Sequence, residues 1–318
     1  MPIIEASNLV KLFGSFAAVD GISFDVAQGE VVAVLGANGA GKTTTMRLLT
    51  GYYAPTSGSV KLDGIDVVRE PRRSQAMVGY LPEVPPLYPE MTVQSYLQFV
   101  ARLRGARRAA ARVQAQRAME RCWLADRADW VIGHLSRGYR QRVGIAQAIV
   151  SDPQVLILDE PTSGLDPEQI LMVRKLIAEL ARDRTVLFST HILAEAEKVC
   201  SRALIVRDGK LLADEPIASL VARRGATDEV RLTVSGSAAV VVPALEGLSG
   251  VRHVAVTAND ASSSRLELHV TASRGAGLVN ELTSTVLVGG WRLEAIEPCR
   301  PSLEDVYLKL VGAAETSA

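Results

Sequence analysis

Residues 36–43 read Gly-Ala-Asn-Gly-Ala-Gly-Lys-Thr, the glycine-rich sequence of a phosphate-binding loop. An apolar run, Val31–Leu35, precedes the loop, and a stretch with helical character, Thr43–Leu49, follows it. A strand, a glycine-rich turn and a helix in this order form the context that the motif requires. The sequence therefore favours a nucleoside triphosphate site over a glycine-rich turn without function.

Each residue type in the loop suits a phosphate group. The glycines allow the backbone N–H groups to point inward, and the following helix adds the positive end of its dipole. Lys42 is expected to contact the β- and γ-phosphates and to assist catalysis, and the Thr43 hydroxyl is expected to bind Mg²⁺. The residues expected to contact the nucleotide here are Gly36, Asn38, Gly39, Ala40, Gly41, Lys42, Thr43 and Thr44.

A second element of the site is expected where another buried strand ends. The continuous apolar run Val155–Leu158 is followed by Asp159 and Glu160. Carboxylates at the end of a buried strand are costly unless they are paired or hold a cation. We expect Asp159 to contact Mg²⁺ and Glu160 to act as the general base that polarises the attacking water. The alternative is a solvated strand end without a catalytic role.

Bulk composition limits the other functions of the chain. The 318 residues suffice for one large domain or two ordinary ones, and Lys+Arg and Asp+Glu each total 35. This balance gives no reason to expect a nucleic-acid partner. Three widely separated cysteines, no signal peptide and no apolar run of about 18–20 residues favour a cytoplasmic protein. If the protein works at a membrane, another chain must supply the spanning part.

The chain divides unevenly into two regions. Apolar strand-like runs alternate with helical stretches through a first domain, residues 1–222, which is typical of a parallel α/β core. Two antiparallel strands, Pro2–Val10 and Ala17–Val26, are expected before the loop. Residues of about 92–151 predict an inserted helical subdomain. The runs that predict the core strands are Val31–Leu35, Val155–Leu158, Val186–Ser189 and Ala203–Val206.

The second region, residues 226–312, predicts a small accessory domain. Its alternating strands and intervening helices follow the order β-α-β-β-α-β, which fits a ferredoxin-like fold. A terminal helix is expected over Pro301–Val311. The segments that carry this prediction are Glu229–Val234, Ala238–Leu245, Val251–Thr257, Arg265–Val270, Gly277–Leu287 and Trp291–Glu297.

A family resemblance joins these motifs. The segment Leu135–Arg142, Leu-Ser-Arg-Gly-Tyr-Arg-Gln-Arg, resembles the signature motif of ATP-binding cassette (ABC) ATPases. Ser163–Asp166 looks like the D-loop of that family, and His191 looks like its switch histidine. Phe13 lies where the family places an aromatic ring that stacks on adenine. The resemblance covers residues 3–220 and implies an α/β P-loop cassette with a mixed sheet, an antiparallel N-terminal subdomain and a helical subdomain.

The resemblance also implies how the chain works. ATP and Mg²⁺ are the expected ligands, and His191 is expected to contact the γ-phosphate. In the family, a site like that of Ser136 and Gly138 grips ATP bound to the opposite subunit, which implies a homodimer or a heterodimer with a related chain. Asp166 is expected at this dimer interface and can also cap the helix that starts at Pro167.

The chain departs from the usual family pattern in two motifs. The usual signature Leu-Ser-Gly-Gly-Gln has Arg137 and Tyr139 at its third and fifth positions here. Ser136 and Gly138 are kept, so we expect a working signature with altered surroundings. Glu83 stands where most members have a Q-loop glutamine, and it is expected near the Mg²⁺-bound water. An additional carboxylate at that place adds negative charge close to the triphosphate.

With these departures, the Glu83 loop and the signature resemble those of cassettes that pair with ABC-2-type permeases. The most similar cassettes are those of gliding motility, nitrous-oxide-reductase maturation and multidrug export. The resemblance implies an exporter ATPase held by its permease at the cytoplasmic face of the membrane. Two other classes stay open: a soluble ABC ATPase acting in translation or DNA maintenance, and a regulatory module that binds ATP without turnover. The seven arginines from Arg102 to Arg121 fit a solvated helical face, or contacts with anionic lipid or an acidic permease segment.

Overall fold

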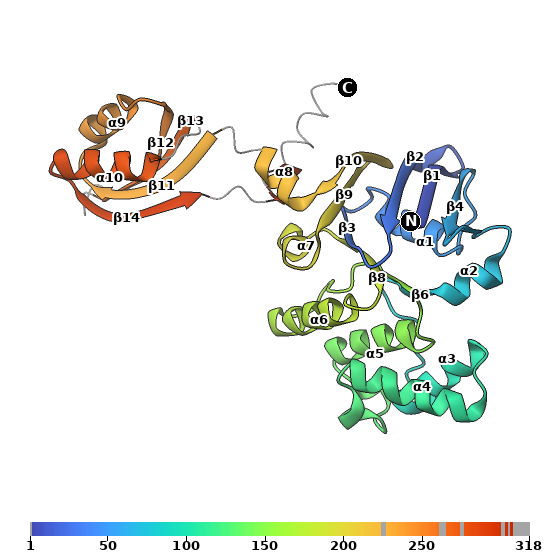
Figure 1. Ribbon diagram of the computed structural model, residues 1–318. Helices are drawn as coiled ribbons and strands as arrows, with labels where there is room; N and C mark the ends of the chain where they lie inside the picture. Colours follow the sequence, from blue (N-terminus) through green and yellow to red (C-terminus); the bar gives the residue numbers. More distant parts are fainter. Residues whose placement is uncertain are drawn as a thin grey trace. The chain divides into compact units, whose positions relative to one another are not determined.

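The computed structural model describes residues 2–223, 227–260, 265–273, 277–299, 303–304 and 306–307. Its residues form two compact units, and the division falls between Ile217 and Ala218, within helix α8 (Ile217–Arg223). Figure 1 shows the elements of both units. No described helix combines the length and the apolar character that a bilayer crossing requires.

A six-stranded sheet forms the centre of the first unit. Five of its strands are parallel, and β10 pairs antiparallel with β9 at one edge. Strands β3 and β7 are apolar along their whole length, as is typical of parallel strands that are covered on both faces. The strands, in the order of the sheet, are β10 (Lys210–Pro216), β9 (Arg202–Arg207), β3 (Val31–Leu35), β8 (Thr185–Thr190), β7 (Val155–Leu158) and β6 (Val78–Leu81).

An antiparallel sheet lies at the N-terminal side of this unit. It runs in the order β2–β1–β4–β5, and its alternating buried residues pack in one hydrophobic core with strands of the six-stranded sheet and helix α1. The hairpin of β1 and β2 ends with Phe13 opposite Phe16. The strands are β1 (Pro2–Phe13), β2 (Phe16–Ala27), β4 (Ser57–Leu62) and β5 (Ile65–Asp66), and the helices beside them are α1 (Lys42–Leu49) and α2 (Pro71–Met77).

Three helices occupy the segment expected to be helical. They lie together below the six-stranded sheet in Figure 1, and α4 buries alanines against its neighbours while its arginines face outward. Thr92 caps the first of these helices by accepting a hydrogen bond from the Ser95 N–H. The helices are α3 (Val93–Leu103), α4 (Arg108–Arg121) and α5 (Arg137–Ile149), and the two helices that follow later in the chain are α6 (Pro167–Leu180) and α7 (Leu193–Val199).

The second unit has the β-α-β-β-α-β order of a ferredoxin-like fold. Its antiparallel sheet runs β12–β13–β11–β14, and one core joins the sheet to both helices. Of the helix expected over Pro301–Val311, most residues lie outside the described part of the chain. The elements are β11 (Thr227–Ser235), α9 (Ala238–Glu246), β12 (Val251–Asp260), β13 (Arg265–Ser273), α10 (Leu278–Val288) and β14 (Arg292–Cys299).

Candidate nucleotide site

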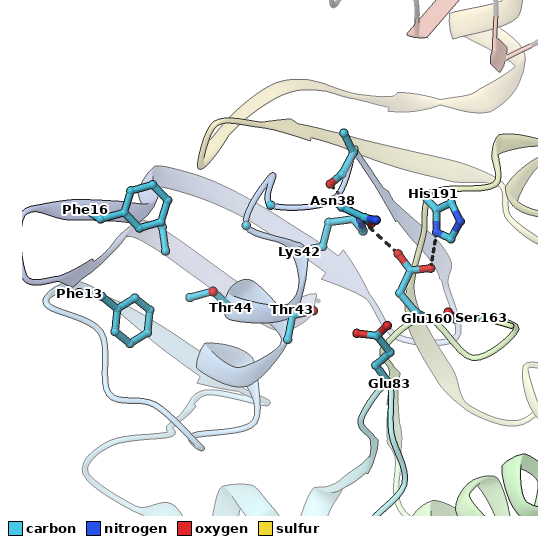
Figure 2. Close-up of a pocket in the computed structure, with 14 residues that line it drawn as sticks. Phe13, Phe16, Asn38, Lys42, Thr43, Thr44, Glu83, Glu160, Ser163 and His191 are labelled. Atoms are coloured by element: carbon cyan, nitrogen blue, oxygen red, sulfur yellow. Dashed lines mark hydrogen bonds and ion pairs between the residues drawn. The ribbon is translucent and has the colours of Figure 1, made fainter.

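An open pocket of about 530 Å³ lies over the loop that joins β3 to α1. Two phenylalanines stand at one end of the pocket, and Lys42, Glu160 and His191 stand at the other (Figure 2). The residues that line it are Phe13, Phe16, Ala18, Ala37, Asn38, Gly39, Gly41, Lys42, Thr43, Thr44, Glu83, Glu160, Ser163 and His191. The structure therefore brings most of the residues predicted to contact the nucleotide and its metal to one place; Gly36 and Ala40 support the loop without lining the pocket.

The loop is shaped by close backbone contacts. Gly41 has a φ of 105°, and a Cβ at this position would lie 2.5 Å from the carbonyl oxygen of Ala18. Only glycine meets both conditions without strain. Lys42 opens α1, and its Nζ donates to the carbonyl oxygens of Gly36 at 2.8 Å and Ala37 at 3.2 Å. The ammonium group is thus folded over the loop at the place where a phosphate would approach.

Glu160 stands between a cation and an imidazole at the end of β7. Its Oε1 lies 3.1 Å from Lys42 Nζ, and its Oε2 lies 2.8 Å from His191 Nδ1, as the dashed lines in Figure 2 show. Its φ of 47° is left-handed, which is unusual for a residue other than glycine and is typical of functional positions. The carboxylate is buried, whereas the His191 side chain is 45% exposed. A base with this environment can face a water molecule in the pocket.

Asp159 is fully buried beside the threonine of the loop. Its Oδ1 accepts hydrogen bonds from the Ser189 hydroxyl at 2.7 Å and from the Thr43 hydroxyl at 3.2 Å. Its Oδ2 has no hydrogen-bond partner among the described residues. Burial raises the pKa of Asp159, and the nearby carboxylates of Glu160 and Glu83 raise it further, against the lowering by the two hydroxyls. A cation at Oδ2 would relieve this cost.

The far end of the pocket is aromatic. Phe13 ends β1 and Phe16 begins β2, and their side chains are 45% and 62% exposed. Both rings line the pocket at the end away from Glu160 and His191 (Figure 2). Exposed rings of this kind offer stacking surface to a flat base. The prediction named Phe13 alone; Phe16 is its cross-strand partner and lines the same end.

The signature residues lie outside the pocket. Ser136 caps α5, and its exposed hydroxyl is 3.4 Å from the Tyr139 N–H. Gly138 packs against α6, since a Cβ there would lie 2.1 Å from Gln169 Oε1. Neither Ser136 nor Gly138 lines the pocket of its own chain. Both residues nevertheless lie at the N-terminal end of α5, which is the positive end of the helix dipole.

The two unusual signature residues have contacts of their own. The Arg137 guanidinium donates from Nη2 to the carbonyl oxygen of Ser163 at 3.0 Å. The Tyr139 ring faces two guanidinium groups, that of Arg142 at 4.1 Å and that of Arg127 at 5.4 Å from its centroid. Arg137 therefore joins the signature to the D-loop, and Tyr139 joins it to Arg127 in the segment before α5.

The D-loop aspartate caps a helix. Asp166 is exposed, and its Oδ1 accepts a hydrogen bond from the Gln169 N–H at 2.9 Å at the start of α6. Pro167 follows at the first helical position, where its missing N–H costs nothing. The capping role that the sequence suggested is thus present, and the side chain stays on the surface near Gly138.

Two polar residues near the site were not predicted. Ser189 accepts the Glu160 N–H at 2.9 Å while its hydroxyl bonds Asp159, so it supports both carboxylate residues. Ser163 lines the pocket beside Glu160. The register of β7 and β8, which pairs Leu158 with Phe188, carries Asp159 and Ser189 to the same edge of the sheet. Ser189 could have been predicted only by knowing that β7 and β8 are neighbours in the sheet.

Comparison with known proteins identifies the family. The family model described as "ABC transporter" matches residues 19–163. YxlF of Bacillus subtilis, described as an uncharacterized ABC transporter ATP-binding protein, is 36% identical over 98% of this chain and 100% of its own length. The bacitracin transport ATP-binding protein BcrA of Bacillus licheniformis is 32% identical over 98% of this chain and 97% of its own. The Nod factor export ATP-binding protein I of Paraburkholderia xenovorans is 39% identical over 72% and 76%.

Solved structures agree with these sequences. An ATP-binding subunit of an ABC transporter is 30% identical and superposes with a TM-score of 0.63, covering 70% of this chain and 93% of its own. The subunit cbiO1 from Clostridium perfringens is 26% identical with a TM-score of 0.64, over 70% and 92%. The cassette fold expected from the sequence is confirmed. The chain belongs to the ATP-binding proteins of ABC transporters and is an ATPase, as its motifs predicted.

Proposed function

We propose that this chain is the ATP-hydrolysing subunit of an ABC-2-type membrane exporter and that it drives a separate permease chain. The observation that carries the enzymatic part is the placement of Glu160, held between Lys42 and His191 at the phosphate end of the pocket. This arrangement supplies a base, a cation and a polar contact around the place where the γ-phosphate would lie.

Each group has a separate task in this proposal. The loop N–H groups and Lys42 bind the β- and γ-phosphates, and Phe13 stacks on the base with Phe16 beside it. Glu160 accepts a proton from the water that attacks the γ-phosphate. His191 holds Glu160 from one side and contacts the γ-phosphate, while Lys42 stabilises the negative charge that develops on it.

The residues present fit a magnesium ion. The orphaned, fully buried Oδ2 of Asp159 and the adjacent Thr43 hydroxyl form the hard oxygen donor set that Mg²⁺ prefers. Glu83 lines the same pocket and would accept from a water bound to the ion. The ion would neutralise phosphate charge when it is bound.

The signature is proposed to serve a second cassette, which we take to be another copy of this chain. Ser136 and Gly138, at the start of α5, do not line the pocket of their own chain. In a head-to-tail pair each signature would close the opposite pocket over the γ-phosphate, with Asp166 at the interface. ATP would favour the closed pair, and hydrolysis would release it.

The exporter assignment is supported by relatives and by the signature departures. The relatives named for bacitracin transport and Nod factor export match 98% and 72% of this chain. A permease would hold the chain at the cytoplasmic face of a membrane, with a docking segment between the helical subdomain and the Glu83 loop. The exposed arginines of α4 would face that permease or anionic headgroups. The second unit corresponds to residues 226–312 as predicted from the sequence. We propose that it is an accessory domain that supports or regulates the dimer of cassettes.

The first test replaces the proposed base. The Glu160→Gln chain should lose ATP hydrolysis by at least about 100-fold, because the amide cannot accept the proton, while ATP binding remains. With Mg²⁺ and ATP, sedimentation should show this variant trapped as a dimer. Full hydrolysis by Glu160→Gln would exclude the proposed mechanism.

A second test addresses the transport role. Co-expression with a permease encoded beside this chain should give a membrane complex whose ATPase activity depends on both proteins. Transport of cargo into inverted vesicles should then require ATP and should stop with Glu160→Gln. If the chain forms no complex with any membrane protein encoded beside it, the exporter assignment is contradicted.

A further inference from the structure

A third buried carboxylate lies near the site and has no role in the mechanism above. Glu195 is in the first turn of α7, four residues after His191, and it is 3% exposed. It does not line the nucleotide pocket. Its place on α7 distinguishes it from Asp159 and Glu160, which directly follow β7.

Glu195 connects two segments through one oxygen atom. Its Oε2 accepts a hydrogen bond from the Thr162 hydroxyl at 2.6 Å and another from the Thr190 hydroxyl at 3.3 Å. Both threonines are buried. Both hydroxyls donate toward the same oxygen of Glu195, and this fixes their orientation.

The two threonines belong to the parts of the chain that must be held for hydrolysis. Thr162 lies between Glu160 and Ser163, at the start of the D-loop. Thr190 directly precedes His191, and its oxygen also accepts the Ile192 N–H at 3.0 Å. Since its proton is committed to Glu195, Thr190 has a lone pair free for this turn. Glu195 thereby orders the backbone on both sides of His191.

A second contact holds the short segment between Glu160 and the D-loop. Gln141 on α5 is buried, and its Nε2 donates to the carbonyl oxygen of Pro161 at 2.8 Å. The residues next to Glu160 are therefore fixed by one side chain from the signature helix and by one from α7. Movement of either helix would be transmitted to Glu160 and to His191.

The environment of Glu195 argues against a role in stability. No lysine, arginine or histidine of the described residues lies within ion-pair distance of its carboxylate, and its Oε1 has no hydrogen-bond partner among them. A buried carboxylate without a cation is destabilising compared with a neutral side chain of similar shape. A group that weakens the fold yet orients two threonines is expected to act through what it orients.

We propose that Glu195 is a positioning residue for ATP hydrolysis, whose carboxylate fixes the D-loop through Thr162 and the His191 segment through Thr190. The inference rests on the proposed function of Glu160 and His191 and adds what sets their geometry. Glu195 itself touches neither nucleotide nor attacking water. Its loss should therefore slow turnover without weakening ATP binding.

The test measures steady-state ATP hydrolysis and thermal unfolding of full-length variants. Glu195→Gln should lower kcat roughly tenfold and leave KM for ATP within about twofold, because a neutral amide oxygen in the place of Oε2 holds the two hydroxyls more weakly than a carboxylate oxygen does. Its melting temperature should equal or exceed that of the wild type. The matched control is Glu246→Gln, an exposed glutamate on α9, which should change none of these values.

A second variant separates positioning from misfolding. Thr162→Val removes the shorter hydrogen bond and should also lower kcat with little effect on KM. If both act through one contact, the double variant should be no slower than the slower single variant. Should Glu195→Gln fail to fold, the result for Thr162→Val decides the question.

Two outcomes would overturn the inference. One is kcat within twofold of the wild type for Glu195→Gln and for Thr162→Val; the other is a loss of kcat that accompanies a lower melting temperature or a raised KM. Glu160→Gln measured in the same series tests the proposed base separately. Full activity of Glu160→Gln would refute the proposed function, whereas full activity of Glu195→Gln would refute only this inference.

Discussion

The pocket residues of the P-loop side and the signature at the start of α5 are built in opposite ways. Lys42, Asp159 and Glu160 are 5%, 0% and 6% exposed and contact one another or their neighbours. Ser136 is exposed and contacts only its own helix among the described residues. The first region is preorganised and electrostatically costly within one chain; the second is the start of a helix, whose first N–H groups have no partner within the helix.

This difference explains why the chain carries both elements at separate places. Buried charges around the loop need a triphosphate and a cation to compensate them, so this region binds nucleotide by itself. The exposed helix start costs little because water satisfies its N–H groups. We infer that the P-loop side determines affinity and the signature side determines turnover.

The largest expected effect is on the P-loop side. Lys42→Ala removes the cation that faces the phosphates and leaves the buried Glu160 carboxylate without its partner. ATP affinity should fall by about 100-fold, which is about 2.7 kcal/mol. Titration with a fluorescent ATP analogue measures this, and the exposed Lys61→Ala on β4 is the control. Unchanged affinity would show that the pocket does not bind the triphosphate as proposed.

A smaller effect, on hydrolysis and not on ATP affinity, is expected for the signature motif. Ser136→Ala should slow hydrolysis roughly tenfold and leave ATP affinity of the isolated chain unchanged, because Ser136 does not line the pocket. Thr92→Ala is the matched control, since Thr92 caps α3 as Ser136 caps α5. Both variants should lose about 1 kcal/mol of stability from the missing cap. If Ser136→Ala and Thr92→Ala hydrolyse ATP at the same rate, the signature has no role in turnover beyond capping its helix.

The smallest effect concerns the electrostatic cost of the pocket. Burial raises the pKa of Asp159 above its unfolded value, so its contribution to stability is complete at low pH and is lost as pH rises through the folded pKa. Asp159→Asn does not titrate. Without nucleotide and Mg²⁺, its melting temperature should exceed that of the wild type by a few degrees near pH 7, and the difference should shrink toward about pH 4. Scanning calorimetry at several pH values measures this difference, and a constant or reversed difference would contradict the account.

Local sequence was sufficient for the elements that carry the loop. Val31–Leu35 and Val155–Leu158 form strands with the predicted bounds, because each is a continuous apolar run that ends at a polar or glycine boundary. The helix after the loop begins at Lys42, one residue before its expected start. Motifs with fixed spacing therefore placed Lys42, Thr43 and Glu160 correctly relative to their elements.

Contacts between distant segments could not be predicted from the sequence. Ser189 and Glu195 act on residues about 30 positions away, and only the order of the strands makes them neighbours. Tyr139 was identified as a departure, but the approach of its ring to Arg127, which lies before α5, depends on how that segment packs. Sequence reasoning identified most of the polar groups that line the pocket and missed those that hold them in place.

The central claim is that the P-loop of one chain and the signature of another copy complete a single site. Lys42→Ala keeps an intact signature, and Ser136→Ala keeps an intact P-loop, so a mixed pair would contain one site with both intact parts. Hydrolysis of ATP should be measured for each variant alone and for equal mixtures at the same total concentration. The account predicts that the mixture hydrolyses ATP several times faster than the mean of the two variants. A mixture no faster than that mean would contradict it.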